Sequence, residues 1–392
     1  MTELQFHGRG TEYFKIWIVN ILLTLVTLGL YYPWAKVRTR RYFYGNTEFD
    51  NANFDYHASG KQLFLSYLIA TILFALYVGL SQINPVLSIA ISAIFFLALP
   101  WIVYRGIHFN HRMSSYRNVR FGFNGSLANS YKVFFGYPLV MLFVVGAIGV
   151  IAGVIGSAAG ETGQTLSSAF IGLLVLFAYP TFFALMNKVT TDYFINGAHF
   201  GQEQFFATLK FKSFFAIMLK GMGLGILLAI ITMMVVGMLA YATIGLESLS
   251  SLTTNMQNMK NGTEPELGFF IAIFSVYAFL IPVSMYMVAY FKARHRSYIF
   301  SQMSLGDNIN FESSLSSIKY FGILLTNLIL IILTAGLAYP WTKVRAHRYL
   351  TESITINAPD GFAGYVSKHG KGGALGEELG DAFDIDVGGI AF

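Results

Sequence analysis

The sequence predicts an all-α polytopic protein that crosses a membrane several times, and three observations support this class. Of its 392 residues, 55% are hydrophobic and only 12% are charged, about half the charged share of a soluble globular protein. Uncharged runs long enough to cross a bilayer recur along the chain. The basic residues gather in alternate connections between these runs. This composition argues against disorder, fibres and nucleic-acid binding, and the lack of Cys excludes disulfides and thiolate chemistry.

Seven uncharged runs define the expected helices. They cover residues 16–35, 62–104, 133–160, 162–187, 221–246, 267–291 and 320–342. A helix needs about 20 apolar residues to cross a bilayer, and the second run has twice that length. Asn84 and Pro85 interrupt it in the middle, and because this pair is typical of a turn, the run is expected to form two helices. The chain therefore has about eight hydrophobic segments, of which the middle six are predicted transmembrane helices.

The charged residues predict the orientation in the membrane. The connections after the first, third, fifth and seventh segments hold 18 of the 26 Lys and Arg residues. The connections after the second, fourth and sixth segments hold only Lys260. Because positively charged connections stay inside, the basic connections are predicted to be cytoplasmic. We expect Arg105, Arg112, Lys188 and Arg294 on the cytoplasmic face, with Asn84, Gly163 and Asn261 on the other.

The last hydrophobic segment repeats the first. Residues 320–349 match residues 13–42 at a constant offset of 307, with 16 of 30 positions identical. Roughly two would match by chance. The duplicated polar and basic positions are the candidate functional residues: Asn20, Thr27, Lys36, Arg38, Arg41, Asn327, Thr334, Lys343, Arg345 and Arg348. The polar positions either hold helices together or contact a substrate. The basic positions either anchor the segments at the headgroup level or bind an anionic headgroup or ligand.

A weaker repeat organises the rest of the chain. Units start near residues 6, 54, 121, 200 and 311, so residues 1–350 are read as one transmembrane domain of internal repeats. Each unit opens with an aromatic stretch, expected to form a short strand or extended loop at the cytoplasmic face. Each closes with a proline at a helix end followed by basic residues; these prolines are Pro33, Pro100, Pro180, Pro282 and Pro340. Residues 351–392 are read as a Gly-rich acidic tail.

The duplicated segments leave the topology open. If residues 16–35 and 320–342 each cross the membrane once, both termini lie outside, against the positive-inside rule. If each is a re-entrant hairpin, both ends stay inside, and Gly29 and Gly336 would permit the tight turn. We favour the hairpins. Because a buried Asn needs a partner, we also expect the two segments to pack as a pseudo-symmetric pair at the centre of the bundle, with Asn20 and Asn327 within reach of each other.

Several of these motifs resemble the YjgN-like family of bacterial inner-membrane proteins. They are Phe6-His7-Gly8, Tyr13-Phe14, Asn20, Thr27-Leu28-Gly29, Tyr32-Pro33-Trp34-Ala35, Val119-Arg120-Phe121-Gly122-Phe123-Asn124 and the second Tyr339-Pro340-Trp341 element. The resemblance covers most of residues 6–350. It implies a polytopic inner-membrane protein of a family without an assigned activity, and it supplies no catalytic residues.

Two functions from different classes are the main candidates. The apolar segments hold no ionisable residue at mid-depth, which argues against a proton pump, and no motif or His cluster predicts a catalytic, cofactor or metal site. The internal duplication favours a transporter- or channel-like protein for a small solute. The basic and aromatic connections favour a non-enzymatic lipid-interacting or scaffolding protein, and a membrane enzyme is a third alternative. A polar cavity between the duplicated segments would favour transport, and a dry core the scaffold. The oligomeric state stays open.

Overall fold

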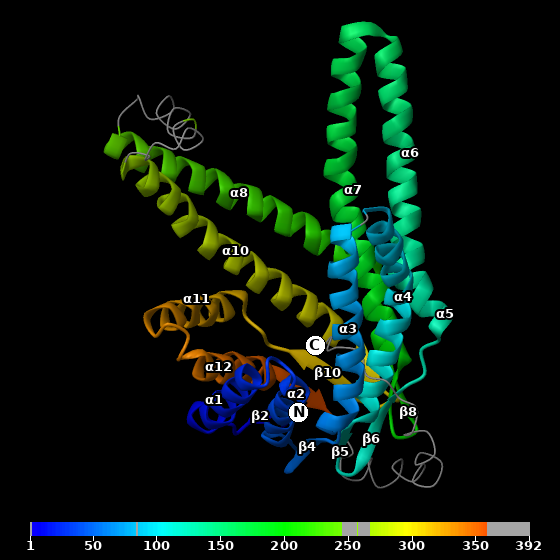
Figure 1. The fold of residues 1–392 in the computed structure, drawn as a ribbon, viewed down its shortest axis with the longest axis vertical. Helices are drawn as coiled ribbons and strands as arrows, with labels where there is room; N and C mark the ends of the chain where they lie inside the picture. The colour runs from blue at the N-terminus through cyan, green and yellow to red at the C-terminus, as the bar shows by residue number, and fades with distance from the viewer. Residues whose placement is uncertain (1, 84, 245–256, 258–266, 359–392) are drawn as a thin grey trace.

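The computed structural model describes residues 2–83, 85–244, 257 and 267–358. Within them the chain passes repeatedly from a short strand into a pair of helices and back to the next strand (Figure 1). The asparagines expected on the outer face, Asn84 and Asn261, and most of the predicted acidic tail lie outside the described residues. The described part of that tail, residues 351–358, completes the last helix and forms a strand.

Two short helix pairs flank three long ones. The short pairs are α1 (Gly10–Val26) with α2 (Tyr32–Gly45) and α11 (Ser317–Leu333) with α12 (Tyr339–Glu352). The long pairs are α3 (Gly60–Ile83) with α4 (Pro85–Arg112), α6 (Tyr137–Ala158) with α7 (Gly160–Gly197), and α8 (Phe211–Ile244) with α10 (Leu267–Ser301). Helix α5 (Leu127–Tyr131) and a π-helical turn, η1 (Lys132–Gly136), lead into α6.

The six long helices fit a membrane-spanning protein. Each is long and apolar enough to cross a bilayer, and at most 11% of its most apolar 18-residue stretch is buried within the protein. An apolar helix surface of this extent is stable only in contact with lipid or another protein. The break expected at Pro85 separates α3 from α4, and Pro85 is the first residue of α4, where the backbone N–H that proline lacks would have no partner within the helix.

The strands form one antiparallel sheet, which the predicted all-α class does not include. They are β1 (Thr2–Glu3), β2 (Gln5–Phe6), β3 (Thr47–Phe49), β4 (Ala52–Tyr56), β5 (Ser114–Tyr116), β6 (Val119–Phe123), β7 (Ala198–Phe200), β8 (Glu203–Ala207), β9 (Met303–Leu305), β10 (Ile309–Ser313) and β11 (Ile354–Asn357). Their order is β1-β11-β10-β9-β8-β7-β6-β5-β4-β3-β2. Only Leu4 separates β1 from β2, so the two ends of the sheet meet in the N-terminal segment and the strands close into a ring.

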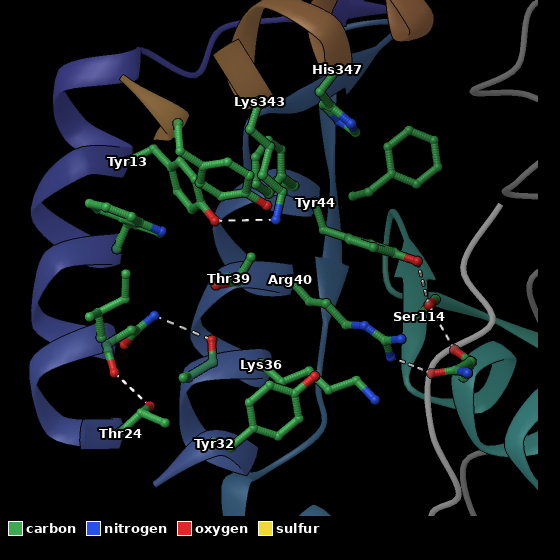
Figure 2. Close-up of a pocket in the computed structure, with 18 of the residues that line it drawn as sticks. Tyr13, Thr24, Tyr32, Lys36, Thr39, Arg40, Tyr44, Ser114, Lys343 and His347 are labelled. Carbon is green, nitrogen blue, oxygen red and sulfur yellow. Dashed lines mark hydrogen bonds between the residues drawn. The ribbon is translucent and has the colours of Figure 1, made fainter. Parts of the chain in front are cut away.

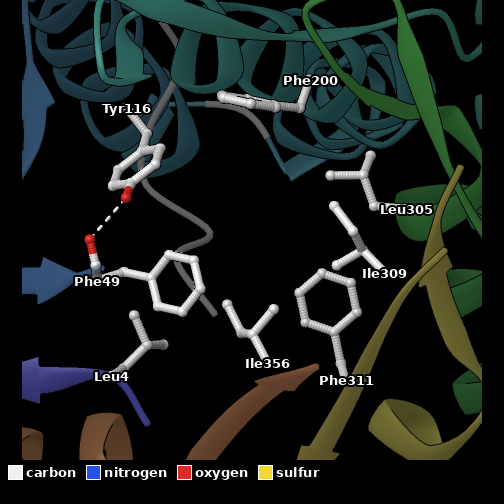
Figure 3. Packing of buried hydrophobic residues seen from close by; sticks show 8 residues of the cluster. All are labelled: Leu4, Phe49, Tyr116, Phe200, Leu305, Ile309, Phe311 and Ile356. Atoms are coloured by element: carbon white, nitrogen blue, oxygen red, sulfur yellow. Dashed lines mark hydrogen bonds between the residues drawn. The ribbon is translucent and has the colours of Figure 1, made fainter. Parts of the chain in front are cut away.

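The inside of this strand ring is an apolar core. Eight buried side chains from strands and turns around the ring converge there, among them Leu4, Phe49, Phe200 and Ile356 (Figure 3). The Tyr116 hydroxyl, also inside, donates a 2.6 Å hydrogen bond to the Phe49 carbonyl oxygen. Because residues from both ends of the described chain share this core, its burial stabilises the closed form of the sheet.

The five prolines were predicted to end helices, and this prediction is wrong. Pro33 and Pro340 are the second residues of α2 and α12, where the fixed φ of proline suits a first turn. Pro100, Pro180 and Pro282 lie inside α4, α7 and α10. Each of these helices continues past its proline to the next strand, so the proline marks a point within the helix rather than its end.

The helices follow the same circular order as the strands. Contacts join α2 to α3, α7 to α8 and α10 to α11, and α12 packs against α1. The duplicated helix pairs are therefore neighbours, but they occupy adjacent places in a ring and not the centre of a bundle. The joint between α12 and α1 brings together the two ends of the described chain.

Candidate functional site

Both duplicated segments fold as a helix, a tight turn and a second helix. The Thr27 hydroxyl donates a hydrogen bond to the Leu23 carbonyl oxygen at 2.7 Å and accepts one from the Tyr31 N–H at 2.9 Å. The Thr334 hydroxyl makes the equivalent hydrogen bonds with Leu330 and Ala338. Gly29 and Gly336 follow in the left-handed region, with φ of 92° and 91°. Glycine adopts this conformation without a steric penalty, so the turns expected at these two positions are present.

The duplicated asparagines do not pair with each other. Asn20 Nδ2 donates to the Ala35 carbonyl oxygen at 3.3 Å, and Asn327 Nδ2 donates to the Thr342 carbonyl oxygen at 3.0 Å. Both asparagines are buried. The expectation of a shared partner across the pair is therefore wrong, because each asparagine finds a backbone acceptor on the second helix of its own hairpin, 15 residues further on.

The duplicated tryptophans form two equivalent joints. A Cβ atom at Gly60 would lie 2.2 Å from Cδ1 of Trp34, and a Cβ atom at Gly10 would lie 2.2 Å from Cδ1 of Trp341. Each glycine opens the first helix of the next pair in the ring, α3 or α1. The joint between α12 and α1, which are far apart in sequence, is thus built like the joint between the sequence neighbours α2 and α3.

Arg41 and Arg348 support the same two joints. Arg41 Nη2 donates to the Ala58 carbonyl oxygen at 2.7 Å, two residues before α3, and Arg348 Nη2 donates to the Gly8 carbonyl oxygen at 2.8 Å, two residues before α1. Arg345 Nη1 donates a hydrogen bond of 2.8 Å to Thr326 Oγ1 on α11. Its counterpart Arg38 is exposed. These four arginines are therefore structural or surface residues and not members of one site.

A cavity of about 970 Å³ lies between the duplicated segments, lined by α1, α2 and α12 (Figure 2). The end of α4 and strands β4 to β6 complete its wall through residues that include Phe54, Asn110 and Phe121. Trp17, Ile21 and other side chains of α1 make one side mainly apolar. Of the ten duplicated candidates, the structure brings three to this cavity: Asn20, Lys36 and Lys343.

The charged side chains that the described residues contribute to the cavity are basic. Lys36, Arg40 and Lys343 line it, and none of the described residues in the lining is Asp or Glu. Lys343 Nζ donates to the Tyr13 hydroxyl at 3.3 Å and lies 5.3 Å from the centre of the Phe43 ring. These contacts orient the ammonium group through neutral partners, a hydroxyl and an aromatic ring.

Arg40 likewise has neutral partners. Its guanidinium donates to the Tyr56 hydroxyl at 2.8 Å and to Asn110 Oδ1. Burial lowers the pKa of His347, which also lines the cavity, to about 4, and the nearby charge of Lys343 contributes to the same shift. Nε2 of this histidine is buried and makes no hydrogen bond to the described residues.

Sequence comparison within the chain misses Arg40 and His347 for a specific reason. The two occupy the same place in the duplicated segments, at the offset of 307, but they differ, and only identical positions were taken as candidates. A search for positions that keep an ionisable side chain without keeping its identity would find them. Among the described residues, no group of three or more His, Asp or Glu side chains has the arrangement of a metal site.

Comparison with known proteins places this architecture in a family. A family described as "Bacterial protein of unknown function (DUF898)" matches residues 1–382. The chain belongs to this family. It is 28% identical over 355 residues to a protein of Salmonella typhimurium named inner membrane protein YjgN, covering 90% of the chain and 88% of that protein. The inner membrane protein YjgN of Escherichia coli K12 is 28% identical over 346 residues, covering 86% and 84%. No solved structure matches the chain.

Proposed function

We propose that the protein is a transporter-like component of the bacterial inner membrane that takes a small solute into the cavity between the duplicated hairpins. The observation that supports this most directly is the cavity of about 970 Å³, which is large enough for an organic solute. A dry core between the duplicated segments would favour a scaffold instead. The location follows the names of the relatives.

The orientation that we propose places the sheet in the cytoplasm. Arg112, at the end of α4, and Arg294, near the end of α10, lie on the sheet side, whereas Glu161 opens α7 at the far end of its helix pair. Positive residues favour the cytoplasmic side. The basic cavity then opens among cytoplasmic connections, where a solute would enter.

The short helix pairs are proposed to be re-entrant hairpins. A 14-residue helix is about 21 Å long, too short for a hydrocarbon core of about 30 Å. Both pairs begin and end at strands of the same sheet, so a single crossing would not fit them. Arg345→Cys in this Cys-free chain should react with a membrane-impermeant maleimide from the cytoplasmic side; reaction from outside would contradict the hairpin.

We further propose that the chain is built of five units, each a strand, a helix pair and a strand. The backbone amide of His7 donates to the Asn46 carbonyl oxygen at 2.9 Å, and His57 makes the same bond with Met113 at 2.8 Å. Equivalent bonds join Asn124 to Gly197 at 2.6 Å and Ser314 to Ser353 at 3.0 Å. In each case the residue after the opening strand bonds the residue before the closing strand, which supports a common plan.

The alternative, a lipid-interacting or scaffolding protein, has its own support at the helix ends. The guanidinium of Arg105 lies 5.8 Å from the Trp101 ring centre, and that of Arg294 lies 5.8 Å from the Tyr290 ring centre. Aromatic and basic side chains together are typical of the headgroup level, where they contact anionic lipids. Such contacts anchor a protein but require no cavity.

Two-sided access to the cavity separates transport from the alternative without knowledge of the solute. Thr24 lines the cavity, so Thr24→Cys would be labelled with an impermeant maleimide in right-side-out and inside-out vesicles. Exposed control positions are Arg38→Cys, expected to react only from the cytoplasm, and Thr162→Cys, expected to react only from outside. Transport predicts that Thr24→Cys reacts from both sides. Reaction from one side only, with both controls behaving as expected, would refute transport and leave a binding protein.

A further inference from the structure

The buried asparagines of the two duplicated hairpins differ in their partners. In the last hairpin, Asn327 Oδ1 accepts from Arg345 Nη1 at 3.5 Å, and the same nitrogen donates to Thr326 Oγ1 at 2.8 Å. Both ends of the Asn327 amide therefore have partners within their own hairpin. In the first hairpin, Asn20 Oδ1 is buried and makes no hydrogen bond to the described residues.

One substitution between the two copies accounts for this difference. The counterpart of Arg345 is Arg38, which is exposed. The counterpart of Thr326 is Val19, which has no hydroxyl to hold a guanidinium. Because a buried acceptor is unfavourable without a donor, Asn20 Oδ1 is suited to a donor that comes from outside its hairpin.

Asn20 meets the cavity together with a second acceptor, Thr24. Both residues line the cavity, one helical turn apart on α1. The Thr24 hydroxyl donates to the Asn20 backbone carbonyl oxygen at 2.6 Å, so its oxygen can accept but has no second proton to donate (Figure 2). Asn20 Nδ2 donates to the Ala35 carbonyl oxygen, which identifies Oδ1 as the acceptor end of the amide. The counterpart of Thr24 is Ile331, so the other copy lacks this pair of acceptors.

The lining matches a solute that carries several hydroxyl groups. Two neighbouring acceptors need a ligand with two donors, whereas Arg40, also in the lining, can only donate. A hydroxyl group both donates and accepts, so several hydroxyls can satisfy all three side chains. Trp17 and Tyr32 add aromatic faces, against which the C–H groups of a sugar ring can pack. A volume of about 970 Å³ accommodates a solute of one or two sugar rings.

We propose that Asn20 is the recognition residue of the cavity and that the ligand is a polyhydroxyl solute, such as a sugar or a sugar alcohol. Its hydroxyls donate to Asn20 Oδ1 and Thr24 Oγ1, and its ring lies beside the aromatic side chains of the lining. This inference names the solute class of the proposed transporter and rests on that function for the solute's role.

Equilibrium dialysis of the full chain, in a detergent without a sugar head group, tests the ligand class. The probes are D-glucose, maltose and myo-inositol. Cyclohexanol is the matched control, because it keeps the ring of myo-inositol with a single hydroxyl. We expect Asn20-dependent binding of a polyhydroxyl probe at least about tenfold tighter than that of cyclohexanol, since a site built for hydroxyl groups rejects an analogue that lacks them. No Asn20-dependent binding of any of the three probes, or equal binding of cyclohexanol, would overturn the proposal.

The duplication supplies a matched control variant. Asn20→Leu and Asn327→Leu each remove a side-chain hydrogen bond to a backbone carbonyl oxygen, but of the two residues only Asn20 lines the cavity. Asn20→Leu should weaken binding about tenfold or more, and Asn327→Leu should leave it within about twofold. Asn20→Leu should also lower the unfolding temperature less, because it removes an acceptor that has no donor. Equal loss of binding in the two variants would refute the role of Asn20.

Val19→Thr tests the acceptor without altering it. The new hydroxyl gives Arg38 the anchor that Arg345 has in the other copy, so the Arg38 guanidinium can donate to Asn20 Oδ1. We expect the affinity for the bound probe to fall at least about threefold with no loss of thermal stability. Arg38→Gln in the same background should restore the affinity. An affinity unchanged by Val19→Thr would contradict the proposal.

The two proposals can fail separately. If Thr24→Cys reacts from one side only while Asn20-dependent binding of a polyhydroxyl probe persists in the unsubstituted chain, transport fails and the site stands. If Thr24→Cys reacts from both sides but no probe binds through Asn20, the site fails and transport stands.

Discussion

The joint between α12 and α1 can be tested with a single added methyl group. Gly10→Ala would place a Cβ atom 2.2 Å from Cδ1 and 2.7 Å from Cγ of Trp341. Gly60→Ala would create the same 2.2 Å contact with Trp34 at the joint between α2 and α3. Neither ring can move freely, because Trp341 packs against Phe14 and Trp34 packs against Phe64, with ring centres 5.0 and 5.1 Å apart.

The size of the destabilisation expected in Gly10→Ala and Gly60→Ala follows from overpacking. Extra atoms in a packed contact cost about 1–3 kcal/mol, so both variants should unfold at a temperature lower by about 2–6 °C, at about 2 °C per kcal/mol. The variants differ in how the strain can be released. The joint at Gly60 is tied by the hairpin of β3 and β4, whereas the joint at Gly10 closes only through non-covalent contacts, including the β1–β11 pairing.

Hydrogen exchange distinguishes the two joints. Strain of about 1–3 kcal/mol at Gly10 should raise the population of the open joint about 5- to 150-fold, and exchange of the amides in residues 2–6 should rise in proportion. Gly60→Ala should leave these amides protected. Trp341→Phe, which offers a smaller ring, should recover part of the loss in Gly10→Ala. The reasoning is refuted if the two alanine variants show the same exchange in residues 2–6, or if neither lowers the unfolding temperature.

Three further outcomes are expected. Gly336→Ala places an L side chain at φ 91° and should cost about 1–2 kcal/mol in thermal unfolding, whereas Gly172→Ala, with no atom within 4 Å of its added Cβ, should not destabilise. Asn327→Leu removes the 3.0 Å hydrogen bond to the Thr342 carbonyl oxygen and should lower the free energy of unfolding in denaturant by about 1 kcal/mol. An unchanged unfolding midpoint would show that this hydrogen bond makes no net contribution to stability. Burial lowers the pKa of His347 to about 4, below the usual 6.5, so the unfolded chain binds more protons between these values and stability falls as the pH drops through them. The loss from pH 8 to pH 5 should be about 2 kcal/mol smaller in His347→Asn, and identical pH profiles would contradict the shift.

Local sequence predicted the features that depend on local physics. Pro85 is the first residue of α4, because the start of a helix does not use the backbone N–H that proline lacks. The turns at Gly29 and Gly336 occur because glycine accepts positive φ. The long helices follow from apolar runs, each of which is long enough to cross a bilayer.

The sequence was less informative where long-range pairing decides the outcome. The aromatic stretches indicated short strands, but hydrogen bonds between segments that are distant in the chain determine that they form one closed sheet. The asparagines were expected to pair across the two hairpins because they are duplicated. A carbonyl oxygen 15 residues away lay within reach in both cases, and only the folded hairpin reveals that acceptor.

The sequence by itself determined that this is a polytopic membrane protein with a duplicated segment, because hydropathy and charge act over short stretches of chain. The tertiary structure decided which duplicated residues meet. Closure of the ring brings Tyr13 against Lys343, 330 residues later in the chain, and the cavity forms beside this contact. Arg40 and His347 enter the cavity although they differ between the two copies, because their position on the helix face, and not their identity, sets what they line.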